Sequence, residues 1–250
     1  MSIGFTIPAL SAGWAGRHPR WVAASLSIIA LCCGLALWAG GREGEGDRAE
    51  IYAERRLQTI NTQLDEARKG FIFMAGDSHA ELMNAAYRLC GREVVNGGVS
   101  GARAELYEDV ARRLEFAAHP EIVVLTIGTG DVSHSKDPLS PRTMSAFERS
   151  VARTVALFGK VAKRVVVTAL PPIGPSLGES FEIPAVAAYS ERLRALCAKE
   201  GCEFVDPFMT FREEDGATAQ PGATRDGLHM SSYRVVQTRL AALICPNGSL

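Results

Sequence analysis

Short apolar runs alternate with amphipathic stretches along the chain from residue 70 onward. The apolar runs are rich in β-branched residues and predict five strands, at Phe71–Ala75, Glu93–Asn96, Ile122–Ile127, Arg164–Ala169 and Glu203–Val205. Because several of these segments contain a continuous apolar run, we expect strands that are covered on both faces.

Between these runs, apolar residues recur at the spacing of helices. Four stripes stand out: Leu106, Val110 and Leu114; Val151, Val155, Leu157 and Phe158; Tyr189, Leu193 and Leu196; and Val235, Val236, Leu240, Leu243 and Ile244. A further apolar helix is expected over His79–Leu89. Strands that alternate with helices predict an α/β fold with a mostly parallel sheet and helices on both faces. In such a sheet the ligand site forms beyond the carboxyl ends of the strands.

An uncharged stretch of 19 residues, Trp21–Ala39, lies near the N-terminus. As a helix it would be about 28 Å long, which is close to the hydrocarbon thickness of a bilayer. Two arginines precede it without an acidic residue, whereas Arg42–Arg56 mixes four arginines with five acids. By the positive-inside rule we expect residues 1–20 in the cytoplasm, residues 21–39 as a transmembrane anchor, and the rest outside, in the periplasm or at the cell surface.

A cleavable signal peptide is the alternative interpretation of residues 21–39, and a buried helix of a soluble protein is a third. The apolar core is long for a signal peptide, and Leu37-Trp38-Ala39 is a poor cleavage site. A buried soluble helix would need a polar face, which this stretch lacks. An uncleaved anchor is therefore favoured, and both of the first two interpretations export the rest of the chain.

Residues 40–69 join this stretch to the α/β region, which spans residues 70–250. Residues 40–46 are rich in glycine and charge, which is typical of a flexible linker. Asp47–Lys69 predicts an amphipathic helix with the apolar stripe Ala53, Leu57, Ile60, Leu64 and Ala67. About two heptads are too few for a convincing coiled coil, so we expect the stripe to pack on its own domain rather than in a dimer seam. The oligomeric state stays open.

Charge and cysteine content narrow the classes of partner. The formal net charge is −1 and no dense run of Lys or Arg occurs, which argues against nucleic acid and favours a small substrate or a neutral polymer. The six cysteines include no Cys-x-x-Cys pair, and no His cluster has ligand spacing, so a structural zinc site is not expected. Cys197 and Cys202 flank the predicted end of a helix and could form a disulfide in an oxidising compartment.

Ser78 follows the first predicted strand and begins the predicted helix His79–Leu89. A serine in that place is an ordinary helix N-cap, but its hydroxyl would also lie at the positive end of the helix. Asp226-Gly227-Leu228-His229 lies in a predicted loop near the C-terminus. A serine nucleophile needs a base that takes its proton and an acid that orients the base, and His229 and Asp226 can supply both from one loop.

Four segments resemble, in order, the sequence blocks of the SGNH/GDSL hydrolase family: Phe71–Ser78 (FIFMAGDS), Asn96–Gly101 (NGGVSG), Ile127–Asp131 (IGTGD) and Asp226–His229 (DGLH). The match extends from about Phe71 to the C-terminus. The resemblance implies a three-layer α/β/α sandwich with a flavodoxin-like sheet order, and hydrolysis or transfer of acyl groups without a cofactor or a metal. It also implies that Ser78 is the nucleophile, His229 the general base and Asp226 the residue that orients His229.

The third block departs from the family pattern, because Gly130 stands where the family has an Asn side chain that donates to the oxyanion hole. The resemblance leaves the backbone N–H groups of Ser78 and Gly101 as donors. Loss of one donor costs on the order of a hundred- to a thousand-fold in rate. Thr129 or Ser133 could substitute, the Gly130 N–H could turn inward, or the enzyme could be slow. A catalytically inactive, carbohydrate-binding descendant is a further alternative.

The form Gly76-Asp77-Ser78-His79-Ala80 is similar to that of extracytoplasmic SGNH domains that act on O-acetylated surface polysaccharides. Together with the predicted anchor it favours an esterase for acyl, chiefly O-acetyl, esters of a cell-envelope or extracellular carbohydrate. O-acetyl transfer to a glycan, hydrolysis of lipids or thioesters, and glycan binding without catalysis stay as alternatives. Asp77 and Asp131, inside the motifs, are expected to brace loops by hydrogen bonds.

Overall fold

The computed structural model describes residues 48–86 and 88–246 of the 250-residue chain. The predicted cytoplasmic segment, anchor and linker, at residues 1–20, 21–39 and 40–46, lie outside the described residues. Within the described part, no helix is both long and apolar enough to cross a bilayer.

A five-stranded parallel sheet forms the centre of the described chain, with the strand order β2-β1-β3-β4-β5. The strands are β1 (Ile72–Gly76), β2 (Val94–Gly98), β3 (Ile122–Thr126), β4 (Arg164–Thr168) and β5 (Glu203–Val205). All five predicted strands are confirmed, with ends that differ by two residues at most. The order is that of a doubly wound, flavodoxin-like sheet, in which ligands bind beyond the carboxyl ends of the strands.

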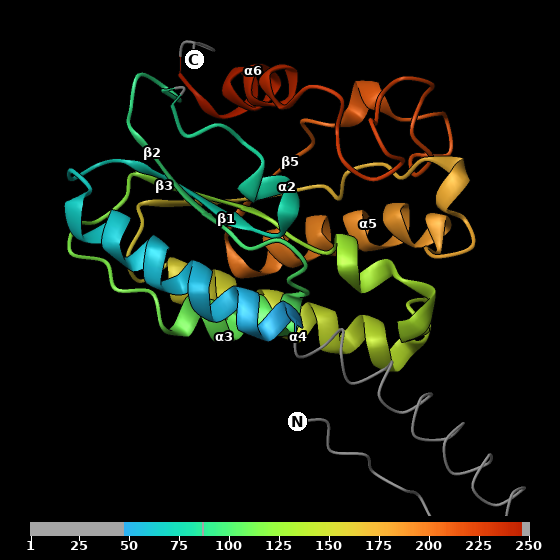
Figure 1. Cartoon of the computed structure of the whole chain (residues 1–250), viewed down its shortest axis with the longest axis horizontal. Coiled ribbons are helices and arrows are strands. Elements are labelled where there is room, and N and C mark those ends of the chain that lie inside the picture. The colour runs from blue at the N-terminus through green and yellow to red at the C-terminus, as the bar shows by residue number, and fades with distance from the viewer. Residues whose placement is uncertain (1–47, 87, 247–250) are drawn as a thin grey trace, which may run out of the picture. The chain divides into compact units, whose positions relative to one another are not determined.

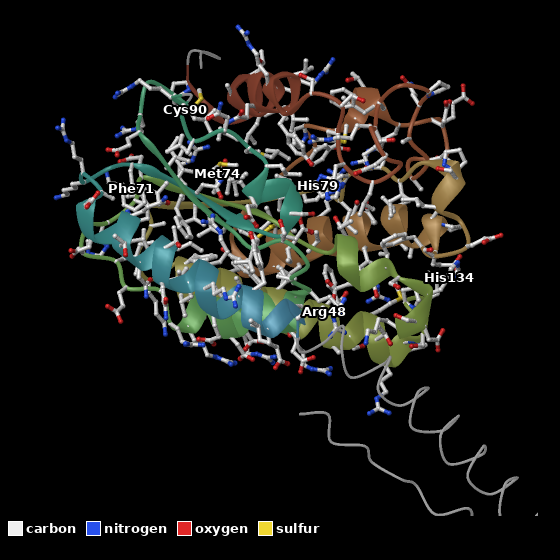
Figure 2. All side chains as sticks on the ribbon, in the orientation of Figure 1. Arg48, Phe71, Met74, His79, Cys90 and His134 are labelled. Carbon is white, nitrogen blue, oxygen red and sulfur yellow. A yellow bond between two sulfur atoms is a disulfide. The ribbon has the colours of Figure 1, made fainter. Side chains whose placement is uncertain are left out.

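Helices cover both faces of the sheet, as the alternation of strands and helices predicts (Figure 1). The helix over residues 48–66, α3 (Ala104–Arg112), α4 (Pro141–Phe158) and α5 (Ile183–Glu200) share one core with Phe73 and Ala75 of β1. On the other face, α6 (Tyr233–Ile244) packs over Met74, which is labelled in Figure 2. Successive strand residues therefore point to opposite layers, and both layers are apolar.

Short helical turns complete the connections between these elements. They are α2 (Ser78–Glu81), η1 (Thr129–Val132), η2 (His134–Lys136), η3 (Pro175–Leu177) and η4 (Met209–Phe211), where η denotes a 3-10 helix. Two of them, α2 and η1, follow the carboxyl ends of β1 and β3, which are neighbours in the sheet. This placement brings the first and third sequence blocks together.

The apolar stripe on residues 48–66 packs on its own domain. Leu57 is 5% exposed, and Ile60 and Leu64 are fully buried in the core shared with β1. A seam that is buried in this way is not available for a coiled-coil dimer.

The prediction of a helix over His79–Leu89 is wrong, because α2 ends after one turn at Glu81. The side-chain amide of Asn96 donates to the carbonyls of Ala80 and Met83 at 3.1 and 2.8 Å, and to that of Glu81 at 3.0 Å. These bonds satisfy the carbonyl groups that a longer helix would use itself.

The prediction of a buried apolar stripe on α6 is correct in part. Val236, Leu240 and Ile244 are buried, whereas Val235 and Leu243 are 42% and 50% exposed. The N-cap of α6 is Ser232, and its hydroxyl accepts the N–H of Val235 at 3.4 Å.

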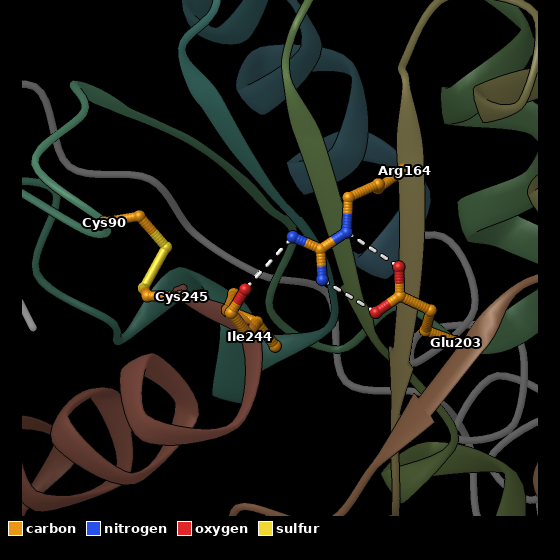
Figure 3. Close-up of a disulfide and its surroundings, with 5 residues drawn as sticks. All are labelled: Cys90, Arg164, Glu203, Ile244 and Cys245. Atoms are coloured by element: carbon orange, nitrogen blue, oxygen red, sulfur yellow. Dashed lines mark hydrogen bonds and ion pairs between the residues drawn. A yellow bond between two sulfur atoms is a disulfide. The ribbon is translucent and has the colours of Figure 1, made fainter. Parts of the chain in front are cut away.

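Within residues 48–86 and 88–246, two disulfides secure the fold. The expected Cys197–Cys202 bridge closes the end of α5, and a second bridge joins Cys90 to Cys245, just after α6. Beside this second bridge, Arg164 at the start of β4 donates to the Ile244 carbonyl at 3.0 Å and forms a two-pronged ion pair with Glu203 at 2.7 Å (Figure 3). Covalent and polar contacts therefore both hold the C-terminal end of α6 at the amino edge of the sheet.

Candidate active site

The structure brings Ser78, His229 and Asp226 together at the carboxyl edge of the sheet. His229 Nε2 lies 3.1 Å from Ser78 Oγ, and His229 Nδ1 lies 2.7 Å from Asp226 Oδ2. The serine and the histidine are 151 residues apart in the sequence. The three side chains form the hydrogen-bonded chain that a serine nucleophile, its base and the orienting acid require.

A tight turn after β1 sets the position of Ser78. Gly76 has φ 132°, and a Cβ at this residue would lie 1.7 Å from the Thr126 carbonyl oxygen, so only glycine fits between β1 and β3. Asp77 then caps α2 by accepting the N–H of His79 at 2.9 Å. Because α2 is a single turn, local N–H groups, and not the dipole of a long helix, provide the positive potential at Ser78.

The surroundings of Asp226 favour its ionised form. Its Oδ1 accepts the backbone N–H groups of Leu228 at 3.0 Å and of His229 at 2.7 Å. Burial alone would raise its pKa, but the bonds from the His229 ring and from these two N–H groups outweigh burial and hold the pKa of Asp226 well below its usual range. The side chain is also 49% exposed, which favours the charged form.

A cleft of about 540 Å³ lies over these side chains. Ser78, Gly101 and Gly130, the three residues expected at the oxyanion hole, all line it. None of their three backbone N–H groups has a hydrogen-bond acceptor among the described residues. Free N–H groups in a cleft are the donors that a developing oxyanion needs.

The missing Asn side chain leaves room for Arg103. A Cβ at Gly130 would lie 3.0 Å from Arg103 Cγ, so Arg103 packs across the face where a side chain would project. Of the two side chains considered as substitutes, Thr129 lines the cleft, whereas the Ser133 hydroxyl bonds to Ser135 and to the Ser180 carbonyl.

Asp77 and Asp131 brace the loops, as expected. Asp77 Oδ2 accepts the N–H of Thr129 at 3.2 Å and so links the first block to the third. Asp131 Oδ2 accepts the N–H of Ala104 at 3.0 Å and links the third block to α3. Burial raises the pKa of Asp77 to about 6 and that of Asp131 to about 7.

Glu81 is a bracing residue that the sequence did not reveal. Its carboxylate accepts the N–H of Ser100 at 2.6 Å, next to Gly101, and pairs with Arg56 at 3.5 Å and with the Tyr52 hydroxyl. Arg56 in turn donates to the Gly98 carbonyl at 3.0 Å. The helix over residues 48–66, which precedes the first motif, therefore supports the second block. No local pattern signals a contact across such a separation.

The remaining described histidines lie outside the hydrogen-bonded chain. His79 is fully buried toward α6, where its Nδ1 lies 3.0 Å from the Tyr233 hydroxyl, and burial lowers its pKa to about 3 (Figure 2). His119 bonds to the Val161 carbonyl and His134 to the Gly178 carbonyl. Among the residues that the structure describes, no group of three or more His, Cys, Asp or Glu side chains could hold a metal ion.

Arg225 lies at the rim of the cleft and its guanidinium stacks 5.6 Å from the centre of the Tyr233 ring. Its backbone N–H donates to the His229 carbonyl at 2.9 Å, which closes the loop that carries Asp226 and His229. Arg225 therefore supports this loop and also faces the cleft.

Solved structures share this fold at low sequence identity. A Bacteroides fragilis protein described provisionally as an acylhydrolase has a TM-score of 0.60 and 19% identity, and the alignment covers 75% of this chain and 94% of that one. A GDSL-like lipase from Bacteroides thetaiotaomicron has a TM-score of 0.56 and 18% identity, over 75% and 94% of the two chains. The acetylxylan esterase Axe2 from Geobacillus stearothermophilus has a TM-score of 0.53 and 17% identity, over 71% and 93%.

No curated protein matches the chain. A family model does match it over residues 74–233, and this model describes the GDSL-like lipase/acylhydrolase family. The matched span begins within β1, includes Ser78 and His229, and ends at the first residue of α6. The chain therefore belongs to the GDSL-like lipase/acylhydrolase family and is a carboxylic ester hydrolase.

Proposed function

We propose that the protein hydrolyses acyl esters, chiefly O-acetyl esters, of a cell-envelope or extracellular carbohydrate through a Ser78–His229–Asp226 triad. The single observation that carries this proposal is the hydrogen-bonded chain from Ser78 Oγ to His229 Nε2 and from His229 Nδ1 to Asp226. It faces a cleft with three free backbone N–H donors.

The geometry supports a two-step acyl transfer. Ser78 Oγ attacks the ester carbonyl while its proton moves to His229 Nε2, and Asp226 stabilises the imidazolium that forms. The N–H groups of Ser78, Gly101 and Gly130 donate to the oxyanion. His229 then gives the proton to the leaving sugar oxygen, and an acyl-Ser78 ester remains. Water, deprotonated by His229, releases the carboxylic acid and restores Ser78.

Two features support an acetylated carbohydrate as the substrate. The cleft beside Ser78 is lined by the small residues Gly101, Ala102 and Gly130, which suit a short acyl group. The fold is shared with Axe2, which is an acetylxylan esterase. The cleft is open at Arg225 and Leu82, so the part of a polymer that carries the ester can extend past it.

We also propose that the domain acts outside the cytoplasm, tethered by residues 21–39. The Cys90–Cys245 and Cys197–Cys202 disulfides support this placement, because such bridges persist in oxidising compartments. Cell fractionation, followed by protease treatment of intact cells, tests it. A protein that stays in the soluble cytoplasmic fraction with its cysteines reduced would contradict it.

The test of function uses the full-length protein with nitrophenyl acetate, with and without a sugar acceptor. We expect acetate release that falls by about a thousandfold or more in Ser78→Ala. Equal rates for the two proteins would overturn the triad proposal. Acetylated sugar that appears faster than free acetate would instead identify a transferase with the same nucleophile.

A further inference from the structure

A second pocket, of about 300 Å³, lies between the start of α3, the η1–η2 segment and α4. Five basic side chains line it: Arg103, Lys136, Arg142, Arg149 and Arg153. The acidic residues that line it are Glu105 and Asp131, so with both ionised the pocket has a net charge of +3 (five minus two).

Most of these cations make no direct ion pair with a described residue. Arg153 pairs at 2.5 Å with the buried carboxylate of Glu108, which Arg112 also contacts. Arg103, Lys136, Arg142 and Arg149 have no ion pair with any described residue. Four unpaired cations around one hollow repel each other, and an anion placed among them would relieve this repulsion.

The basic pocket adjoins the proposed catalytic cleft. Gly130 lines the cleft and Asp131, the next residue, lines the basic pocket. Arg103 also lines the basic pocket, and its Cγ lies 3.0 Å from the position of a Cβ at Gly130. The absence of a side chain at Gly130 thus lets Arg103 lie between the two hollows.

We propose that this basic pocket binds an acidic sugar, through its carboxylate or phosphate group, of the glycan whose ester lies at Ser78. This proposal rests on the proposed function, because it assigns the charge of the same substrate. Guanidinium groups pair with carboxylates and phosphates through two parallel hydrogen bonds, and three of the four unpaired cations are arginines. A concave pocket beside the catalytic cleft fits a group on the substrate chain better than the flat surface of an anionic membrane.

The test measures binding of the full-length protein to two acidic probes, a short oligogalacturonate and a phosphorylated oligomannose, by calorimetry at low salt. The unphosphorylated oligomannose is the neutral reference. The test variant is Arg142→Glu/Arg149→Glu, because both side chains are exposed on α4 and make no hydrogen bond or ion pair with a described residue. The matched control is Arg68→Glu/Lys160→Glu, which has the same net charge but alters exposed residues that precede β1 and β4, at the opposite edge of the sheet.

We expect the parent protein to bind at least one acidic probe more tightly than the neutral reference. The Kd for that acidic probe should rise about tenfold or more in the test variant but not in the control variant. Its Kd should also rise with salt. Equal binding of acidic and neutral probes, or equal effects of the two variants, would overturn the proposal. So would binding to phosphatidylglycerol vesicles that depends on Arg142 and Arg149 while neither sugar binds.

These probes carry no ester, so their binding does not depend on catalysis. Hydrolysis of nitrophenyl acetate, which has no acidic group, should be unchanged in the test variant. If the parent protein hydrolyses nitrophenyl acetate in a Ser78-dependent way but binds neither acidic probe, the pocket proposal alone is refuted. Absence of Ser78-dependent hydrolysis would refute the proposed function alone.

Discussion

At the residue scale, Asp226 and His229 are held by their own loop. The Asp226 carboxylate uses one oxygen for two backbone N–H groups and the other for the His229 ring. Ser78 is positioned differently, by a tight turn after β1 that requires glycine at position 76. The two halves of the site meet across one hydrogen bond of 3.1 Å, so small movements of either loop would separate nucleophile from base.

Also at the residue scale, we propose that the Gly130 N–H replaces the donor that the missing Asn side chain would supply. Gly130→Pro removes this donor, and we expect kcat to fall by about a hundred- to a thousand-fold. Gly130→Ala is the control, since it keeps the N–H and adds a Cβ whose tightest contact, at 3.0 Å, is with the flexible Arg103 side chain. Steady-state kinetics with nitrophenyl acetate measure kcat for both variants. Equal losses of kcat in the two variants would mean that the Gly130 N–H donates nothing to the oxyanion.

Two buried titratable residues beside Ser78 affect stability with opposite sign. Burial raises the pKa of Asp77 to about 6, so the folded protein keeps a proton that the unfolded chain releases above about pH 4. The contribution of Asp77 to the free energy of unfolding therefore falls as the pH rises from about 4 to about 6. Burial lowers the pKa of His79 to about 3, so its contribution rises with pH up to about 6.5.

A variant separates the contributions of Asp77 and His79 to the pH dependence of stability. Asp77→Asn removes the titration of residue 77 and leaves that of His79. Relative to the parent, its free energy of unfolding should increase between about pH 4 and about pH 6, by at most about 3 kcal/mol. Urea unfolding across this range measures the difference. A constant difference between the two proteins would show that Asp77 does not titrate there.

At the element scale, the helix over residues 48–66 lies outside the family match yet supports the site. Tyr52 and Arg56 on this helix hold Glu81, and Glu81 holds the N–H of Ser100 beside Gly101. The helix therefore does more than connect the domain to the preceding chain. It stabilises the loop that supplies one of the proposed oxyanion donors.

Replacement of Glu81 tests this support. Glu81→Ala removes the acceptor for the Ser100 N–H, and we expect kcat to fall about tenfold with a smaller change in KM, because the Gly101 loop is needed most in the transition state. Glu81→Gln keeps an acceptor oxygen and should restore most of the rate. If KM changes and kcat does not, Glu81 acts on substrate binding and not on the oxyanion loop.

The same elements mark what the sequence could and could not predict. The strands were predictable because each contains a short apolar run, and the order of Ser78, Asp226 and His229 matched the family blocks. The short α2 was not predictable, since Asn96 ends it from a strand that follows later in the chain. Glu81 and the basic pocket were missed for the same reason. Their partners meet only after the sheet has formed.

At the scale of the whole molecule, the two disulfides close loops of very different size. Cys90–Cys245 spans 155 residues and Cys197–Cys202 spans 5. By loop entropy the first should stabilise the fold by about 5 kcal/mol and the second by about 2 kcal/mol. Removal of each bridge by a pair of Cys→Ala substitutions, followed by urea unfolding without reductant, compares them. A larger loss from the short bridge would contradict this order.

The most direct test of the central claim is to trap the nucleophile. Treatment of the full-length protein with diethyl nitrophenyl phosphate should release nitrophenolate and leave a diethylphosphoryl group on Ser78 Oγ, which peptide mass spectrometry can locate. We expect this adduct on Ser78, with esterase activity lost in proportion, and little labelling in His229→Ala. Label on another residue, or esterase activity that persists in protein fully modified at Ser78, would contradict the account.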